Sequence, residues 1–459
     1  MSIQPTRIKP LNDANIRTEE YVLYWMQQSQ RARYNHALEY AVQQANKLGQ
    51  MLLVGFGLMD DYPEANLRHY TFMLEGLTET SAALASRGIK LVLRRGQPPE
   101  VALDLGRRAS MIVCDRGYLR HQRTWRKLVA RQASCPVVQV ESDVVVPVEV
   151  VSDKTEYAAR TIRPKIHRHL ASYLVAFKQS KVKHPSLGLK VKGIELGDTE
   201  ALLRKLNLDR SVPPVSDWLK GGTSRALERF DGFIRHRLKY YDQHSNQPQT
   251  NDISHMSPYL HFGQISPLQL ALKISRVSDS LQTVRDAYIE QLIVRRELAM
   301  NFANYTSDYD AYTCIPGWAQ KTLADHRQDK REYNYSQQQL ENAGTHDPYW
   351  NASMMEMKHT GFMHNYMRMY WGKKILEWSS TPQKAFRTTL AINNKYFLDG
   401  RDPNSYTGVA WIYGVHDRAW TERPIFGKTR YMAASGLERK CDITAYIKKV
   451  EDLVKKVDT

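Results

Sequence analysis

Five short apolar runs, separated by stretches of helical length, place the tightest constraint on how this chain can fold. Each run is bounded by polar or turn-forming residues, and the stretches between them carry helical periodicity. The runs are residues 21–25, 51–56, 89–93, 111–114 and 137–140, and the helical stretches are 31–47, 65–87, 99–107 and 119–131. This alternation predicts an α/β domain over residues 20–150, with a mainly parallel, Rossmann-like sheet covered by helices on both faces. Ligands of such sheets bind at the carboxyl ends of the strands.

The second half of the chain is dominated by helical periodicity. It is clear over residues 226–241, 267–275, 282–301 and 360–378, and strand patterns are scarce. The sequence therefore predicts four parts: a polar tail (1–19), the α/β domain (20–150), an interdomain connection (151–222) and an all-helical domain (223–459). A chain of 459 residues exceeds what one hydrophobic core usually supports, which agrees with more than one domain.

Charge and composition limit the possible functions. The 65 Lys and Arg outnumber the 48 Asp and Glu, giving a net charge of +17 that favours nucleic acid or anionic surfaces as partners.

No apolar stretch approaches the roughly 18 residues of a membrane span, and the first 18 residues lack the core of a signal peptide, so we expect a soluble cytoplasmic protein. The four cysteines are widely spaced and no HExxH motif occurs, so no metal site is predicted.

No glycine-rich dinucleotide fingerprint follows the first strand, which disfavours a nicotinamide dehydrogenase. The residues that carry chemistry lie instead between positions 351 and 420, where tryptophan, tyrosine, methionine and arginine are concentrated. Trp371 and Trp378 are seven positions apart, so on one helix they would share a face about 10 Å apart along the axis, a workable distance for electron transfer. Isolated tryptophans at such spacing are more often core residues.

Two further groups of residues have an ordinary and a functional interpretation. Arg368 and Asp399 could form a fixed dipole beside a redox ring or a structural salt bridge, and spacing alone favours the salt bridge. The second group alternates aromatic and cationic side chains, which suits a platform for an unstacked base but also an ordinary basic loop. Its members are Trp411, Arg418, Trp420 and Arg430.

Several long motifs resemble those of the class II cyclobutane pyrimidine dimer DNA photolyases, members of the photolyase/cryptochrome family. They are RHYTFML (68–74), EYAARTIRPK (156–165), SPYLHFGQIS (257–266), THDPYWNA (345–352), HNYMRMY (364–370), LDGRDPN (398–404) and HDRAW (416–420). The resemblance runs from about residue 20 to 445. It implies an antenna-type α/β domain and a helical domain that holds FAD in a bent form.

The resemblance also implies a reaction and cofactors. Light would excite fully reduced, anionic FAD, which passes an electron to a pyrimidine dimer flipped out of double-stranded DNA and later recovers it. Members of the family differ in their antenna chromophore, of which 8-hydroxy-5-deazaflavin is one example, and the sequence offers no motif that identifies it. A monomer is expected.

Site residues follow from the matching positions. The resemblance assigns the flavin site to Tyr241, Ser254, His255, Met256, Ser257, Pro258, Arg368, Asn393, Asp399 and Asp402, with Asn393 facing flavin N5. It assigns the photoreduction relay to Trp371, Trp350 and Trp378, with Tyr370 beside it. It assigns contacts with the lesion or the opened duplex to Gln291, Arg295, Met369, Trp411, Arg418, Trp420 and Arg430.

Gln291 departs from the family pattern, which usually has a glutamate at this position. An amide can donate a hydrogen bond to a thymine carbonyl but cannot supply a proton. Glu290 and Glu297 are turned away from this position on a regular helix, so neither replaces it. The leading hypothesis is light-driven DNA repair, and a cryptochrome-like photoreceptor with little repair is the alternative. A light-independent nucleic-acid-binding protein is a third possibility.

Overall fold

The computed structural model describes residues 3–457; the ends of the first and last predicted ranges, 1–2 and 458–459, lie outside it. Its N-terminal part contains one six-stranded sheet with the order β1-β6-β5-β2-β3-β4. The strands are β1 (Ile8–Pro10), β2 (Tyr21–Trp25), β3 (Met51–Leu58), β4 (Lys90–Arg95), β5 (Ala109–Asp115) and β6 (Val137–Val140). All neighbours pair in parallel except β1 and β6, which are antiparallel. The predicted α/β domain is confirmed.

The described part of the predicted polar tail is folded, which corrects that prediction. A 3₁₀ turn, η1 (Pro5–Arg7), leads into β1, and Ile3 and Arg7 are buried. The guanidinium of Arg7 donates to the carbonyls of Glu141 and Val144, both at 3.1 Å. An edge strand of three residues is too short to produce a recognisable alternation, so the sequence pattern missed it.

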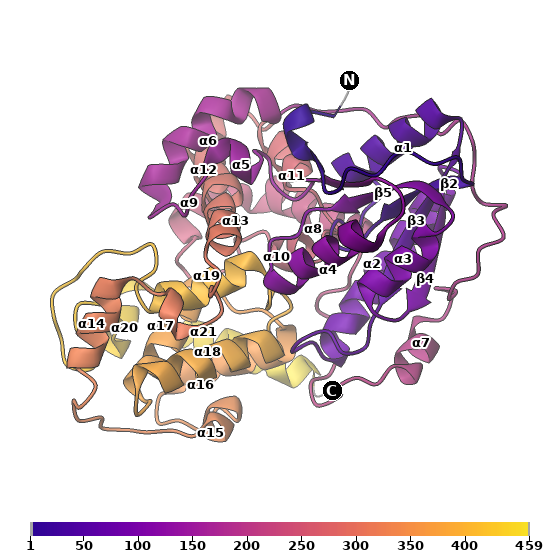
Figure 1. The fold of residues 1–459 in the computed structure, drawn as a ribbon. Helices are drawn as coiled ribbons and strands as arrows, with labels where there is room; N and C mark the ends of the chain where they lie inside the picture. The colour runs from indigo at the N-terminus through magenta and orange to yellow at the C-terminus, as the bar shows by residue number, and fades with distance from the viewer. Residues whose placement is uncertain (1–2, 458–459) are drawn as a thin grey trace.

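Four helices cover the sheet: α1 (His36–Leu48), α2 (Leu67–Ala85), α3 (Pro98–Gly106) and α4 (Arg120–Gln132). Two separate apolar layers, one with Val22 and Val54 and the other with Leu23 and Leu53, show that both faces of the sheet are buried. Figure 1 shows α3 and α4 beside the strands on the right of the molecule. This burial explains why the strands are continuous apolar runs and do not alternate.

The predicted connection contains ordered elements. They are α5 (Val148–Val151), α6 (Ala159–Tyr173) and α7 (Thr199–Lys205). Ile162 and Ile166 of α6 belong to the same apolar core as Phe230 and Leu292 of the helical region. Further on, Ile194 forms an antiparallel bridge to Leu93 of β4, so this segment lies along the edge of the sheet.

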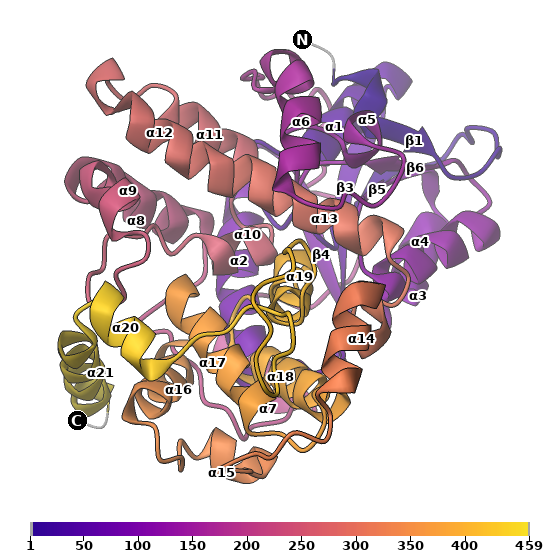
Figure 2. The ribbon, with the colours of Figure 1, turned by 90° about the vertical axis from the view of Figure 1, so that its left-hand side faces the viewer.

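The remainder is helical, as predicted. Its α-helices are α8 (Thr223–His236), α9 (Tyr241–His244), α10 (Ser257–His261), α11 (Pro267–Ile274), α12 (Gln282–Ile289), α13 (Arg296–Tyr305), α14 (Gly317–Asp325), α15 (Gln337–Glu341), α16 (Pro348–Thr360), α17 (Asn365–Glu377), α18 (Pro382–Tyr396), α19 (Pro403–Ile412), α20 (Ala434–Lys440) and α21 (Ile443–Val457). Shorter turns are η2 (Leu238–Tyr240), η3 (Asp279–Leu281) and η5 (Tyr312–Cys314), and η4 (Glu290–Arg295) is a π-helix. Figure 2 shows α12 and α13 as one long rod, which η4 joins.

One predicted helix, over residues 360–378, is wrong at its start. The α16 helix ends at Gly361, whose φ of 67° suits glycine, and α17 begins only at Asn365. A Cβ atom on Gly361 would lie 2.7 Å from Cγ of Leu398. The break places the loop 361–364 against residue 398 and so brings α17 next to the loop that contains Asp399.

Within residues 3–457, no helix is long and apolar enough to cross a membrane. The same residues contain no group of three or more His, Cys, Asp or Glu that could hold a metal ion.

Candidate functional site

Arg368 and Asp399 form a bidentate ion pair in the helical region. Nη1 and Nη2 of Arg368 donate to the two carboxylate oxygens of Asp399 at 3.0 and 3.1 Å, and Nε donates to the carbonyl of Met363 at 3.0 Å. The guanidinium lies 3.9 Å from the ring centroid of Phe397. All three nitrogens of this side chain are therefore hydrogen-bonded, so the structure supplies a rigidly held cation within the predicted flavin site.

Asn393 and Asp402 lie near this pair but are held differently. Both hydrogen bonds of Asn393 come from Nδ2, to Ser405 Oγ at 2.7 Å and to Asn394 Oδ1 at 2.9 Å. Asp402 caps the N-terminus of α19 and accepts from the Asn404 amide at 2.8 Å, while its other oxygen lies 3.3 Å from Nδ1 of His261. Asp402 therefore orders the site from within, and the side-chain oxygen Oδ1 of Asn393 has no partner among these hydrogen bonds.

The predicted phosphate and ribitol end, Tyr241 and residues 254–258, forms a second group. Ser254 Oγ accepts from the hydroxyl of Tyr288 at 2.9 Å, and the rings of Tyr288 and Tyr241 lie 5.2 Å apart. His255 adopts a positive φ of 56° and exchanges a 2.6 Å hydrogen bond with Asn251 through Nε2. Burial raises the pKa of Tyr241 to about 12, so its hydroxyl is a donor at neutral pH.

The two groups are linked by ring contacts. His255 lies 4.6 Å from Phe362, and the guanidinium of Arg368 lies 5.5 Å from the same ring. Burial first, and then the positive charges of Arg229, Lys449 and Arg237, lower the pKa of His255 well below its ordinary value. His255 is therefore neutral, and the cations around it give this end of the site a positive potential that suits phosphate groups.

These residues fit FAD. Two buried polar atoms, Nδ1 of His255 and Nε1 of Trp371, have no hydrogen-bond partner within the described residues. Buried polar atoms without partners are rare and usually face a ligand or water. The turn at His255 would hold the phosphate groups, and Arg368, Asn393 and Trp371 would lie along the ring system.

The three predicted relay tryptophans are in contact. The rings of Trp371 and Trp350 are stacked at 6.5 Å with an interplanar angle of 12°, and Trp350 meets Trp378 at 5.7 Å. Nε1 of Trp350 donates to the carbonyl of Trp371 at 3.0 Å. Trp350, on α16, thus lies between the two tryptophans of the α17 region, and all three are buried.

Tyr370 lies next to Trp371 in the sequence and donates to the carboxylate of Asp347. Burial raises the pKa of its hydroxyl far above the ordinary value.

The predicted platform is assembled around Trp420. The guanidinium groups of Arg418 and Arg430 lie 5.1 and 4.7 Å from its ring, which is 38% exposed. Asp417 accepts from Nε1 of Trp420 and from Nε of Arg430, both at 3.2 Å. Sequence reasoning did not assign Asp417, although its position three residues before Trp420 indicated a local contact.

Trp411 and Met369, members of the predicted lesion set, are half-buried, and α17, which carries Met369, packs against α19. Arg295 lies 5.5 Å from the ring of Trp411 and 3.1 Å from Glu290. Glu290 is also bound bidentately by Arg163. Gln291 is exposed and lies within the π-helix η4, a distortion often found at functional sites. Glu290 is thus engaged elsewhere, and Gln291 is the free polar group of this segment.

A cavity lies at the carboxyl ends of the parallel strands, where the strand order reverses at β2. It is lined by Gln27, Gln28, Gln30, Phe56, Gly57, Leu58, Met59, Tyr62, Ala65, His69, Tyr70, Met73, Gln122, Trp125, His261, Phe262 and Arg401. Its last three lining residues come from the helical region. Nε of the buried Arg401 has no hydrogen-bond partner in the described chain.

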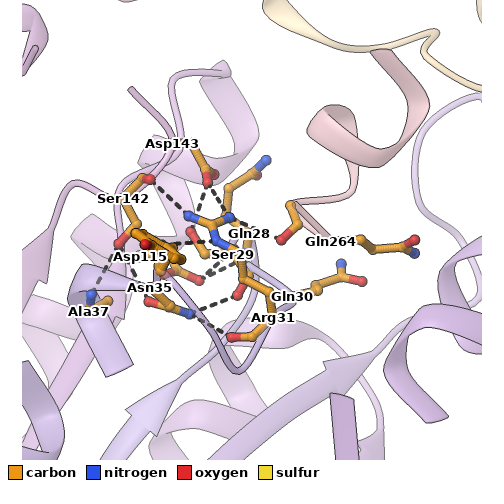
Figure 3. A network of polar contacts seen from close by, with 12 residues as sticks. Gln28, Ser29, Gln30, Arg31, Asn35, Ala37, Asp115, Ser142, Asp143 and Gln264 are labelled. Atoms are coloured by element: carbon orange, nitrogen blue, oxygen red, sulfur yellow. Dashed lines mark hydrogen bonds and ion pairs between the residues drawn. The ribbon is translucent and has the colours of Figure 1, made fainter. Parts of the chain in front are cut away.

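The loop after β2, which lines this cavity, is held by a buried polar network shown in Figure 3. The carboxylate of Asp115 accepts from the amides of Gln28 and Ser29 at 2.9 and 3.0 Å. Arg31 donates to Asp143 at 2.8 Å and to the carbonyl of Gly263 at 3.0 Å. The loop is thereby fixed to both the sheet and the helical region.

An α/β domain joined to a helical domain with a partly buried Arg368–Asp399 ion pair, three tryptophans in contact and an indole between two guanidinium groups agrees with the photolyase/cryptochrome class. A DNA photolyase family model matches residues 22–185. The deoxyribodipyrimidine photo-lyase of Methanothermobacter thermautotrophicus is 49% identical over 98% of this chain and 99% of its own length. That of Arabidopsis thaliana is 40% identical over 99% of this chain and 94% of its own.

Solved structures agree in fold. A class III photolyase from Agrobacterium tumefaciens superposes with a TM-score of 0.73 over 95% of this chain and 87% of its own, at 16% identity. A photolyase from Sulfolobus tokodaii, whose structure contains two FAD molecules, gives 0.69 at 15% identity over 93% and 89%. The chain belongs to the DNA photolyase family, and within it is a deoxyribodipyrimidine photolyase, a light-dependent lyase. The resemblance predicted from its motifs is confirmed.

Proposed function

We propose that the protein repairs cyclobutane pyrimidine dimers in double-stranded DNA by light-driven electron transfer from fully reduced, anionic FAD. The observation that carries the proposal is that one helix, α17, contains a residue of each functional set. Arg368 forms the ion pair of the predicted flavin site, Met369 belongs to the lesion set and Trp371 begins the relay. A single rigid element would therefore position donor, acceptor and relay.

FAD, when bound, supplies the light-excited electron donor. Arg368 would place a positive charge along the ring system and favour its anionic form, because an opposite charge stabilises an ionised group. Asn393, with its side-chain oxygen Oδ1 free, would control the arrival of a proton at N5. Trp371, Trp350 and Trp378 would deliver electrons from the surface to prepare the reduced cofactor.

The proposed DNA interface is the platform of Trp411, Trp420, Arg418 and Arg430. Indole rings stack on unpaired bases and the guanidinium groups bind phosphates of the opened duplex. Gln291, exposed beside Arg295 and Trp411, would donate its amide hydrogen bond to a carbonyl of the flipped dimer. We propose that a single chain binds one lesion.

We further propose that the cavity at the carboxyl ends of the strands holds an antenna chromophore such as 8-hydroxy-5-deazaflavin. Its walls include the aromatic rings of Phe56, Tyr62, Tyr70 and Trp125, which suit a planar ligand. Retention of a fluorescent ligand by the purified protein, and its loss on narrowing the cavity with Ala65→Leu, would test this assignment.

The test of the main proposal is repair of a thymine-dimer duplex by anaerobically reduced protein, in light and in darkness. Gln291→Glu is measured beside the wild type. Repair in light only is the expected result, and repair in darkness or in neither condition would contradict it.

The amide of Gln291, where the family usually has a glutamate, favours one alternative function: a flavin blue-light photoreceptor with little or no repair. In that case the wild type and Gln291→Glu would both be yellow and photoreduce, and neither would repair. A preparation that stays colourless after incubation with FAD would exclude both functions.

A further inference from the structure

The tryptophan relay continues beyond Trp378 into a cluster of two tyrosines and a histidine at the surface. The ring of Trp378 lies 5.3 Å from Tyr335 and 5.3 Å from His346. His346 is stacked on Tyr333 at 3.6 Å with an interplanar angle of 15°, and Tyr333 is 36% exposed. Aromatic rings therefore connect the buried Trp371 to solvent without a gap wider than 6.5 Å between centroids.

Tyr335 and His346 share a hydrogen bond that suits proton transfer. The Tyr335 hydroxyl oxygen lies 2.8 Å from Nδ1 of His346, and it accepts from the backbone N–H of His346 at 3.1 Å. Because the oxygen already accepts the backbone proton, its own proton points to Nδ1, which is the acceptor in the Nε2–H tautomer. A backbone hydrogen bond from the Tyr335 amide to the Trp378 carbonyl, at 3.3 Å, fixes the two rings relative to one another.

Oxidised tyrosine is a very strong acid, so a phenol loses an electron easily only where its proton has a base to move to. The Tyr335–His346 pair meets that condition and touches the last tryptophan. This proton acceptor favours movement of the oxidising equivalent outward, from Trp378 to Tyr335.

We propose that Tyr335 is the terminal electron donor of the relay and His346 its proton acceptor. This inference rests on the proposed photoreduction relay. An electron first leaves Trp378, through Trp350 and Trp371, to a photo-excited oxidised flavin. Trp378 then takes one electron from Tyr335, while the Tyr335 hydroxyl proton moves to Nδ1 of His346. The products are neutral Trp378, a neutral tyrosyl radical and an imidazolium, which can release its proton because His346 is exposed.

Tyr370 is the competing tyrosine. Its hydroxyl is hydrogen-bonded to a carboxylate, Asp347, but no ring contact with any of the three tryptophans is recorded for it among residues 3–457. It is fully buried, and Lys374 lies 5.6 Å from its ring. A proton and an oxidising equivalent left there would stay inside the core, whereas the Tyr335 pair opens to solvent.

Transient absorption after a flash on the oxidised holoprotein tests the proposal, read as the spectra of tryptophan and tyrosine radicals. In the wild type the tryptophan signal should convert into the sharp band of a neutral tyrosyl radical, more slowly in D₂O than in H₂O. Tyr335→Phe should abolish that band and shorten the life of the charge-separated state by about tenfold or more, the effect of about 1.4 kcal/mol on a barrier. His346→Gln should slow the conversion and remove most of the isotope effect.

Two matched variants act as controls. Tyr349→Phe removes a hydroxyl that is bound to Glu438 on the other side of α16, and it should leave the tyrosyl band unchanged. Tyr370→Phe should also leave it unchanged; loss of the band in that variant would overturn the assignment to Tyr335. A persistent band in Tyr335→Phe, or no isotope effect in the wild type, would likewise overturn it.

The flash experiment distinguishes an error in the proposed relay from an error in its extension to Tyr335. If the wild-type flash produces no tryptophan radical, and Trp378→Phe changes nothing, the proposed relay itself is wrong. If tryptophan radicals form normally but no tyrosine signal follows, only the terminal step is wrong. Circular dichroism of each variant shows whether the fold is intact, and Tyr335→Trp, which keeps a ring without the phenol, repeats the test if Tyr335→Phe is unstable.

Discussion

Replacing Asp417 by asparagine should uncouple recognition of damaged DNA from binding of DNA in general. The carboxylate holds Trp420 through Nε1 and Arg430 through Nε, and its side chain is only 8% exposed. An asparagine side chain would keep the shape of Asp417 but lose its charge. Because Trp420 and Arg430 donate to different oxygens of Asp417, asparagine can keep only one of the two hydrogen bonds, in a weaker form. The amide nitrogen in place of the other oxygen is a donor, so the second bond is lost and the ring between its two guanidinium groups loses its fixed orientation.

The magnitude follows from these contacts. A hydrogen bond to a charged group contributes about 1.5–3 kcal/mol and a neutral one about 0.5–1.5 kcal/mol, so one lost and one weakened bond cost the platform about 2–4 kcal/mol, or roughly 30–1,000-fold in affinity for the lesion. Removing one negative charge next to phosphates acts in the opposite direction on every duplex, by about 0.5–1 kcal/mol. Affinity for undamaged DNA should therefore rise about 2–5-fold, while discrimination in favour of the lesion falls about 30–1,000-fold.

Fluorescence anisotropy with two duplexes of identical sequence, one carrying a single thymine dimer, measures both affinities. The matched control is Asp442→Asn, since Asp442 is exposed and caps the amide of Ala445 at 2.9 Å, a role that asparagine also fills. This variant removes the same charge away from the platform and should keep the discrimination. If Asp417→Asn changes both duplexes by the same factor, Asp417 does not order the platform.

Four further outcomes are expected. Trp378→Phe should block photoreduction of oxidised FAD but spare repair by chemically reduced protein; normal photoreduction would exclude Trp378 from the relay. Trp420→Ala should weaken lesion binding by about 1–3 kcal/mol in the same anisotropy assay, and an unchanged affinity would contradict its stacking role. Gln291→Glu should raise light-driven repair about tenfold if a carboxylic acid assists the dimer; equal rates would show that the amide suffices. Burial lowers the pKa of Lys373 from 10.5 to about 7, so between these values the unfolded chain binds the extra proton and the free energy of unfolding rises with pH, by up to about 1.4 kcal/mol per unit. Lys373→Met should remove that slope in urea titrations from pH 7 to 9, and an unchanged slope would assign it to other groups.

The α/β domain was predictable because its strands are buried on both faces and appear as uninterrupted apolar runs. Two strands, β2 and β6, have the predicted limits. The edge strand β1 and the break at Gly361 were not predictable from periodicity, since three residues set no period and a loop of four residues between two helices continues the apolar pattern. Tertiary contacts determine both features: β1 pairs with β6, and Gly361 packs against Leu398.

The site was predictable to a different extent. Motifs predicted which residues form the site, and spacing suggested that Trp371 and Trp378 share a helix face. Spacing within one helix could not show that Trp350, from another helix, lies between them. It also could not show that Asp417 orders the platform, or that a π-helix carries Gln291, because a backbone distortion of one residue leaves no compositional trace.

Arg68 of α2 gives the α/β domain a structural role that does not depend on a ligand. Its guanidinium is buried and donates to the carbonyls of Met357 at 3.2 Å, Tyr396 at 2.8 Å and Lys358, at the ends of α16 and α18. Those carbonyls belong to the segments that precede Gly361 and Asp399. A shortened protein consisting only of the helical region would expose these carbonyls and lose a buried contact behind the Arg368–Asp399 ion pair. The α/β domain is therefore needed for the structure of the helical region, whether or not it holds a ligand of its own.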